Sequence, residues 1–374
     1  MRPSSFVFIA WALAGYAFSA PAAPDMVFPG EDWERTTPEA QGVDSAKLAE
    51  AVANMDANFG STGASELVIV RNGRLIYQGP KSNEFHPIWS CTKTFTSTVL
   101  GLLCDDGLVD LDAPAVEYWP ELDDEYPLYG KIRLRHLASM RGGFRGEVID
   151  KDEDRPWGEP MAYLNPQEPY FEAGSTIQYN DHDVFVLGRI LTLKAGEPLK
   201  AIFERRIADP IGMKQFDWGV SGTVEGIDLN NPPGNPGGQG AGGVKTTAVE
   251  YARVGLLYLN KGNWNGKQLI SEAFVEEATR NQSALEEKFR NIDLRGRYGF
   301  YWWTNGVQSS GVRPWPNAPA GAYTSHGHSS NFCYVIPEWR MVVVRMGQTP
   351  VANTKIVEQR WDAFFGLLGE ALIK

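Results

Sequence analysis

"HPIWSCTKTF", residues 86–95, decides how the rest of this chain is interpreted. It places the Ser90 hydroxyl and the Lys93 amine three positions apart, just before an apolar run. Residues at i and i+3 share one face of a helix, so the two side chains are expected to lie side by side. The N-terminus of a helix also favours a developing alkoxide or oxyanion. The stretch predicts either a serine nucleophile with a lysine beside it or a solvated helix end.

The flanking sequence favours a buried helix. Phe95, Val99, Leu102 and Leu103 fall on one helical face, and Gly107 provides a stop signal. Upstream, residues 44–59 begin with an Asp cap and carry apolar residues at helical spacing. Residues 66–79 predict two short strands joined at Asn72-Gly73, a strong hairpin signal.

The later sequence predicts the other half of a sheet. "YGFYWWTN" (298–305) predicts one strand, and "NFCYVIPEWRMVVVRMG" (331–347) predicts two that turn at Pro337-Glu338. Residues 356–373 predict a closing amphipathic helix, whereas 110–250 contain short helices separated by loops. The expected fold is therefore α+β: an antiparallel sheet built from about 44–110 and 250–374, flanked by helices, with a mainly helical subdomain inserted at about 110–250.

Composition excludes several classes of protein. The 374 residues carry a net charge of −11, so there is no basic footprint for nucleic acid. Arg2, an apolar stretch from Phe6 to Phe18 and small residues after it predict a secretory signal peptide over 1–22, with an uncleaved anchor as the alternative. The mature chain, 23–374, is then expected in the periplasm or outside the cell, without stable membrane insertion. The three cysteines have neither disulfide-framework nor zinc-site spacing.

A serine nucleophile needs a base, and "EAGSTIQYNDHDVF" (172–185) offers Tyr179 and Asp181. With these residues the chain resembles the serine β-lactamase and penicillin-binding protein superfamily, and more closely its esterase and 6-aminohexanoate-dimer-hydrolase-like branch. The resemblance extends from about residue 45 to the C-terminus. It is carried by the stretches 88–122, 132–144, 173–191 and 240–271.

The resemblance implies a role for each matching residue. Ser90 is the acylated nucleophile, and Lys93 and Tyr179 move its proton. Asp181 stands at the Asn position of the family's Y-x-N motif. The third motif falls on His326-Gly327-His328, or on Ser325-His326-Gly327 with a shift of one residue. The backbone N–H groups of Ser90 and His328 then form the oxyanion hole, and no metal or organic cofactor is required.

Two departures from the family pattern affect the chemistry. The third motif has no lysine, which argues against a β-lactam as the main substrate, because a histidine binds an anion only when protonated. Asp181 can only accept hydrogen bonds, whereas the family's Asn also donates them. Asp181 is therefore expected to keep Lys93 as an ammonium, which stabilises a tyrosinate at Tyr179 acting as general base.

Competing signals are weaker. "GHSSN" (327–331) lacks the last Gly of a nucleophile elbow, which argues against Ser329. "DHD" (181–183) indicates a solvated or capping segment rather than a metal site. His86 and His136 are taken as structural. The aromatics Trp157, Tyr163, Tyr170, Phe171, Trp302 and Trp303 belong either to the core or to an acyl pocket.

The function that follows is an exported serine hydrolase that cleaves a small ester, amide or peptide substrate through an acyl-enzyme on Ser90. One alternative keeps this chemistry and acts on cell-wall substrates, as a β-lactamase or D-alanyl-D-alanine peptidase. A second alternative is a non-catalytic binding or sensor module on the same scaffold.

Overall fold

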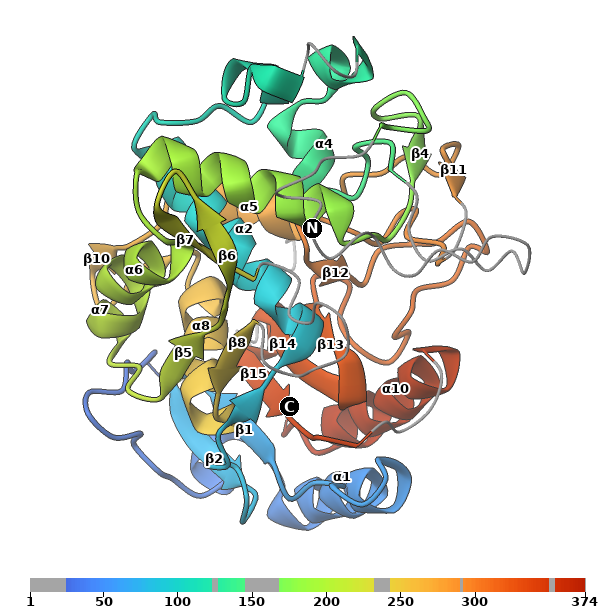
Figure 1. Cartoon of the computed structure of the whole chain (residues 1–374). Helices are drawn as coiled ribbons and strands as arrows, with labels where there is room; N and C mark the ends of the chain where they lie inside the picture. Colours follow the sequence, from blue (N-terminus) through green and yellow to red (C-terminus); the bar gives the residue numbers. More distant parts are fainter. Residues whose placement is uncertain are drawn as a thin grey trace, which may run out of the picture.

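An antiparallel six-stranded sheet organises the molecule, with strand order β12-β13-β14-β15-β1-β2 (Figure 1). The computed structural model describes residues 25–122, 127–144, 168–231, 243–289, 292–349 and 354–373. Two strands come from the start of the chain and four from its end. Their bounds are β1 Leu67–Arg71, β2 Arg74–Gln78, β12 Trp303–Thr304, β13 Tyr323–Gly327, β14 Asn331–Ile336 and β15 Met341–Arg345.

Both predicted hairpins are confirmed. Asn72 and Gly73 join β1 to β2 with φ values of 52° and 77°, the left-handed pair that a two-residue hairpin turn requires. A side chain at Gly73 would also put its Cβ 1.6 Å from the Val27 carbonyl oxygen. A short 3-10 turn, Pro337–Trp339, joins β14 to β15.

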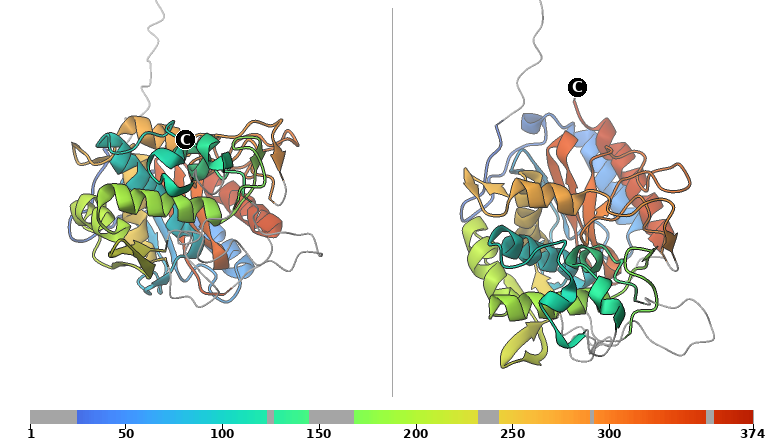
Figure 2. Two further views of the ribbon diagram at one scale, coloured as in Figure 1. Left: turned by 45° about the horizontal axis from the view of Figure 1, so that its top comes forward. Right: turned by 90° about the horizontal axis from the view of Figure 1, so that it is seen from above.

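Helices cover both faces of the sheet, as the strand pleat dictates. Phe332 and Tyr334 of β14 meet Trp361 of α10 (Thr354–Glu370) at ring distances of 5.3 and 4.5 Å. α1 (Ser45–Asn58) lies beside α10 (Figure 2). Cys333, which alternates with these aromatics, faces α8 (Ala248–Leu259) on the other side. A Cβ at Gly255 of α8 would lie 2.8 Å from the Cys333 sulfur, so this glycine allows the close packing.

In the middle of the chain, α2 (Thr92–Asp105) packs against α5 and α6 (Figure 1). This part of the chain mixes helices with short strands. The bounds are β3 His86–Pro87, α4 Leu134–Ala138, β4 Thr176–Ile177, α5 His182–Ala195, α6 Leu199–Phe203, a π-helical turn Glu204–Ala208, α7 Asp209–Ile211, β5 Phe216–Trp218, β6 Val220–Val224, β7 Ile227–Asn230, β8 Val244–Thr246, β9 Asn263–Trp264, β10 Lys267–Gln268, α9 Glu272–Thr279 and β11 Lys288–Phe289.

The α+β class with an antiparallel, helix-flanked sheet is confirmed. The strand predicted at 298–305 is wrong for most of its length, because only Trp303 and Thr304 join the sheet. Tyr301 has a left-handed φ of 62°, and the Gly299 N–H donates to the Trp302 carbonyl at 2.8 Å, so the chain turns there. The run of apolar residues reflects burial in this turn, because Tyr298, Phe300 and Trp302 are all fully buried.

The predicted signal peptide, 1–22, lies outside the described residues, and the subdomain bounds at 110 and 250 stay a prediction. Across the described ranges, every helix is too short or too polar to cross a bilayer.

Candidate active site

Ser90 lies in a 3-10 turn, Trp89–Cys91, that leads directly into α2. The turn is held from both sides: β3 pairs with β8 just before it, and the Val244 N–H donates to the Thr92 hydroxyl at 2.9 Å just after it. Trp89 has a left-handed φ of 55°, an uncommon conformation for a bulky residue, and such strain concentrates at functional sites. Ser90 is therefore a partly exposed hydroxyl on a tightly held turn at the start of a buried helix.

Lys93 is 1% exposed, and its ammonium lies between the other candidate residues. Nζ donates to the Ser90 hydroxyl at 2.9 Å and forms an ion pair with Asp181 Oδ1 at 2.8 Å. It lies 5.0 Å from the centroid of the Tyr179 ring. Burial alone would lower the pKa of Lys93, but the charges of Asp181 and Tyr179 and their hydrogen bonds to the amine raise it above its usual value. Lys93 is thus an ammonium at neutral pH.

Tyr179 and Asp181 reach this point from the turn that precedes α5, in which Asp181 is the N-cap residue. Tyr179 is 7% exposed and packs 5.8 Å from Trp303, ring to ring. Asn180 ties the turn to α5, because its side chain donates to Asp183 Oδ2 at 2.9 Å and accepts from the Asp183 N–H at 2.8 Å. The turn therefore presents alternate side chains, Tyr179 and Asp181, to one amine.

The third motif lies beside the Ser90 turn, at the end of β13. Gly327 is required there, because a Cβ would stand 2.2 Å from the Ile88 carbonyl oxygen and 3.1 Å from the Cys91 nitrogen. The next residue, His328, is exposed, and its ring meets Trp89 edge-on at 5.0 Å. The backbone of 327–328 thus lies against the turn that carries Ser90.

His326 points elsewhere from the same strand. Its ring stacks on Phe332 at 4.3 Å and meets Trp303 edge-on at 5.4 Å. Burial, with the positive charges of Arg297, His328 and Lys93, lowers the pKa of His326 to about 3, so this imidazole is neutral. It cannot replace the missing lysine as an anion-binding group.

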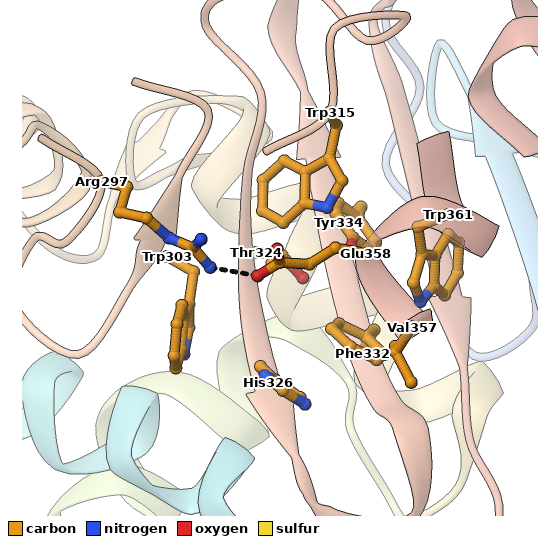
Figure 3. Close-up of a pocket in the computed structure, with 10 residues that line it drawn as sticks. All are labelled: Arg297, Trp303, Trp315, Thr324, His326, Phe332, Tyr334, Val357, Glu358 and Trp361. Atoms are coloured by element: carbon orange, nitrogen blue, oxygen red, sulfur yellow. Dashed lines mark hydrogen bonds and ion pairs between the residues drawn. The ribbon is translucent and has the colours of Figure 1, made fainter. Parts of the chain in front are cut away.

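His326 also lines a small internal cavity, shown in Figure 3 together with the ion-paired Arg297 and Glu358. The cavity measures about 10 Å³, which is room for one water molecule. Trp315 and Trp361 line it with buried indole nitrogens that have no partner among the described residues. It is too small to be a substrate site.

The "DHD" segment is not solvated, contrary to the prediction. His182 and Asp183 are 2% and 0% exposed at the start of α5. Burial raises the pKa of Asp183 to about 8 against the hydrogen bonds from Asn180 and the Gly142 N–H. Asp181 occupies the N-cap position of α5, but its side chain makes no capping hydrogen bond, so the capping prediction is wrong too; the Asn180 side chain accepts the Asp183 N–H instead. Within the described part of the chain, no group of three or more His, Cys, Asp or Glu could hold a metal ion.

A family model described as Beta-lactamase matches residues 48–364, which is most of the chain. The chain belongs to the beta-lactamase family. The resemblance drawn from residues 88–122 and 173–191 is thereby confirmed, and the protein is a serine hydrolase of this family.

Curated relatives of this beta-lactamase family member have several names. A 6-aminohexanoate-dimer hydrolase of Paenarthrobacter ureafaciens is 21% identical over 82% of this chain and 78% of its own length. A beta-lactamase of Pseudomonas fluorescens is 24% identical, but the match covers 51% of this chain and only 59% of that protein. Among solved structures, a family VIII carboxylesterase covers 89% of this chain and 99% of its own at a TM-score of 0.62 and 19% identity, a likeness that shows the fold.

Two polar groups near the site were not foreseen as partners. His86, in the strand before Ser90, forms a buried pair with Glu66 at 2.6 Å. Burial alone would lower the pKa of His86, but the hydrogen bond and charge of Glu66, together with the Pro87 carbonyl, raise it. Arg345, at the end of β15, is fully buried although the sequence places it in an ordinary alternating strand. The His86–Glu66 pair and the burial of Arg345 both depend on tertiary packing, so no local pattern in the sequence predicts them.

The three cysteines are free. Burial raises the pKa of the Cys91 thiol to about 12, so it is a packing residue beside Ser90 and not a competing nucleophile. Of the six aromatics considered for an acyl pocket, Trp157 and Tyr163 lie outside the described residues. Trp302 is fully buried core, and Trp303 contacts Tyr179.

Proposed function

We propose that this beta-lactamase family member is an exported hydrolase that cleaves a carboxylic ester or amide through an acyl-enzyme on Ser90. The observation that carries the proposal is the position of the Lys93 ammonium, 2.9 Å from the Ser90 hydroxyl and 2.8 Å from Asp181. Tyr179 faces the same amine. A serine and a buried cation at the start of α2 therefore meet a phenol from the distant turn before α5 at one partly exposed point.

In the proposed mechanism, Ser90 Oγ attacks the carbonyl carbon and its proton passes to a tyrosinate at Tyr179. Lys93 stays charged and stabilises that tyrosinate, and Asp181 keeps the lysine charged. The oxyanion accepts hydrogen bonds from the backbone N–H groups of Ser90 and His328. When the carbonyl reforms, the ester C–O or amide C–N bond breaks and the leaving group takes the proton from Tyr179. Water then attacks the acyl-enzyme by the same route, which releases the acid and returns a proton to Ser90.

The site favours substrates without an essential carboxylate. The two charged groups beside Ser90 neutralise each other as a pair, and the neutral His326 adds no charge. A carboxylate on the substrate would therefore find no fixed cation in β13, the strand that carries the third motif, and this disfavours β-lactams as substrates. A β-lactamase or D-alanyl-D-alanine peptidase remains the second candidate, favoured by the names of relatives such as the AmpH carboxypeptidase/endopeptidase of Escherichia coli, 28% identical over 42% of this chain.

A fluorophosphonate probe followed by peptide mass spectrometry tests the nucleophile. We expect the label on Ser90, and Ser90→Ala to lower turnover of p-nitrophenyl butyrate by a thousandfold or more. Ser329→Ala is the matched control, since Ser329 belongs to the competing G-x-S pattern, and it should keep the label. A label elsewhere, or none, would contradict the proposal.

Turnover separates the remaining alternatives. Faster hydrolysis of nitrocefin than of p-nitrophenyl butyrate would favour the β-lactamase. Acylation of Ser90 without release would favour the non-catalytic module.

Export is proposed from Arg2 and the apolar stretch that follows it. Fractionation of a bacterial host expressing the full chain, with mass spectrometry of the mature N-terminus, tests this. A product that keeps residues 1–22 in the cytoplasm would overturn it.

A further inference from the structure

The turn that joins β13 to β14 has an unusual backbone. Ser329 and Ser330 have φ values of 62° and 60°, so two consecutive residues with side chains adopt the left-handed conformation. Glycine accepts this region readily, whereas serine does so at a cost. Such a turn persists only where its surroundings hold it.

Arg345 is the group that holds it. Its Nη1 donates to the carbonyl oxygens of Ser329 and Ser330, both at 2.9 Å. Nη2 donates to the Phe59 carbonyl at 2.9 Å, and Nε donates to the Gly63 carbonyl at 3.2 Å. The guanidinium therefore binds four backbone carbonyls from two separate parts of the chain, and it is 0% exposed.

Two neighbouring residues, Gly347 and Asn331, complement the Arg345 guanidinium. A Cβ at Gly347 would stand 2.8 Å from Nη1, so a larger residue there would have to shift the guanidinium. Asn331 completes the restraint, because its Nδ2 donates to the His328 carbonyl at 2.5 Å and to the Gly347 carbonyl at 3.0 Å. The carbonyls of residues 328, 329 and 330 are thus each bound by a buried side chain.

The other side of the turn faces the candidate nucleophile. Gly327 is packed against the Ile88 carbonyl, and His328 meets Trp89, which precedes Ser90. Movement of the turn would therefore change the spacing between the backbone of 328 and that of Ser90.

We propose that Arg345 is a positioning residue for the oxyanion hole: it holds the turn so that the His328 N–H stays within reach of an oxyanion formed at Ser90. The inference rests on the proposed function. Lysine cannot replace Arg345. A single ammonium lacks the planar guanidinium group that binds two adjacent carbonyls and reaches two more.

The test is Arg345→Lys, assayed for kcat and KM with p-nitrophenyl butyrate per folded molecule. We expect kcat to fall at least tenfold with KM within threefold, because a transition-state contact is lost. Adding Ser329→Gly and Ser330→Gly to the lysine variant should recover at least threefold in kcat, since glycine adopts the left-handed φ values without the steric cost that the arginine contacts offset in wild type. A merely structural role would predict no such recovery.

Arg71→Lys is the matched control. Arg71 also binds three backbone carbonyls, of Gln41, Gly42 and Trp339, but at the opposite end of the β1–β15 pair. The Arg71→Lys variant should have a lower melting temperature than wild type and a kcat within twofold of the wild-type value. If Arg345→Lys changes kcat no more than Arg71→Lys does, or if the glycines restore nothing, the inference is wrong.

Should Arg345→Lys fail to fold, Gly347→Ala decides, because its methyl displaces the guanidinium without removing it. A tenfold lower kcat supports the inference, and an unchanged kcat overturns it. Wild-type enzyme without any Ser90-dependent hydrolysis would overturn the proposed function and this inference together. An active wild type with an unaffected Arg345→Lys would overturn this inference alone.

Discussion

Asp181→Asn removes the carboxylate that faces the Lys93 ammonium and keeps the shape of the side chain. At 2.8 Å, the Coulomb attraction in this pair is about 6 kcal/mol for an effective dielectric constant of about 20. Loss of one partner of a buried pair typically costs about 3–5 kcal/mol. Because Lys93 can release its proton, the variant should lose no more than that in unfolding free energy.

The catalytic consequence has a definite sign. Burial is the largest influence on the pKa of Lys93, and it acts downward. Asp181 makes the largest contribution that opposes burial, so the pKa of Lys93 falls in the variant. In the proposed mechanism, the Lys93 ammonium that stabilises a tyrosinate at Tyr179 is then lost at lower pH. We expect kcat to fall about 10–100-fold, which is about 1.4–2.7 kcal/mol, and the alkaline limb of the rate profile to move to lower pH.

The assay is hydrolysis of p-nitrophenyl butyrate from pH 5 to 10, with urea denaturation of the same samples. Asp112→Asn is the matched control, because Asp112 pairs with Arg135 at 2.6 Å on the surface and should change stability by no more than about 1 kcal/mol. A profile for Asp181→Asn that superimposes on wild type, with kcat within twofold, would refute the coupling.

Two other substitutions test the scaffold of the site. Gly327→Ala should cut kcat at least tenfold, because the new methyl, 2.2 Å from the Ile88 carbonyl, pushes β13 away from the Ser90 turn; wild-type kcat would show that this spacing is irrelevant. Glu66→Gln should destabilise the protein by about 1–3 kcal/mol in urea at pH 6. Because the pKa of His86 is raised by Glu66, the loss is full below the usual histidine value of about 6.5 and shrinks as pH rises through the raised value; an equal loss at pH 6 and pH 9 would contradict the assignment.

Local patterns in the sequence predicted the helices and hairpins well, because their causes are local. Asp44 caps α1 by accepting the Lys47 N–H at 3.0 Å, and Asn72-Gly73 turns because both residues tolerate a left-handed φ. The strand prediction at 298–305 was wrong because the cause of the apolar pattern there is not local. These apolar residues are buried by tertiary contacts, and periodicity alone cannot distinguish a buried turn from a strand.

The candidate site also combines features that local sequence predicts with features that only tertiary packing sets. The spacing of Ser90 and Lys93 follows from helix geometry, and the Y-x-N-like motif marks Tyr179 and Asp181 as their partners. Which oxygens meet the amine, and at what distance, depends on how α5 packs against α2. The neutral state of His326, the Glu66 partner of His86 and the burial of Arg345 are likewise decided by packing.

The sequence by itself determined the class of fold, the family and the serine–lysine pair, because caps, turns, periodicity and motifs act over a few residues. Only the tertiary structure decided the neutral state of His326, the approach of Gly327 to the Ser90 turn and the restraint of residues 328–330. Burial and charge at these points come from chain segments tens to hundreds of residues away, and desolvation depends on everything that surrounds a group.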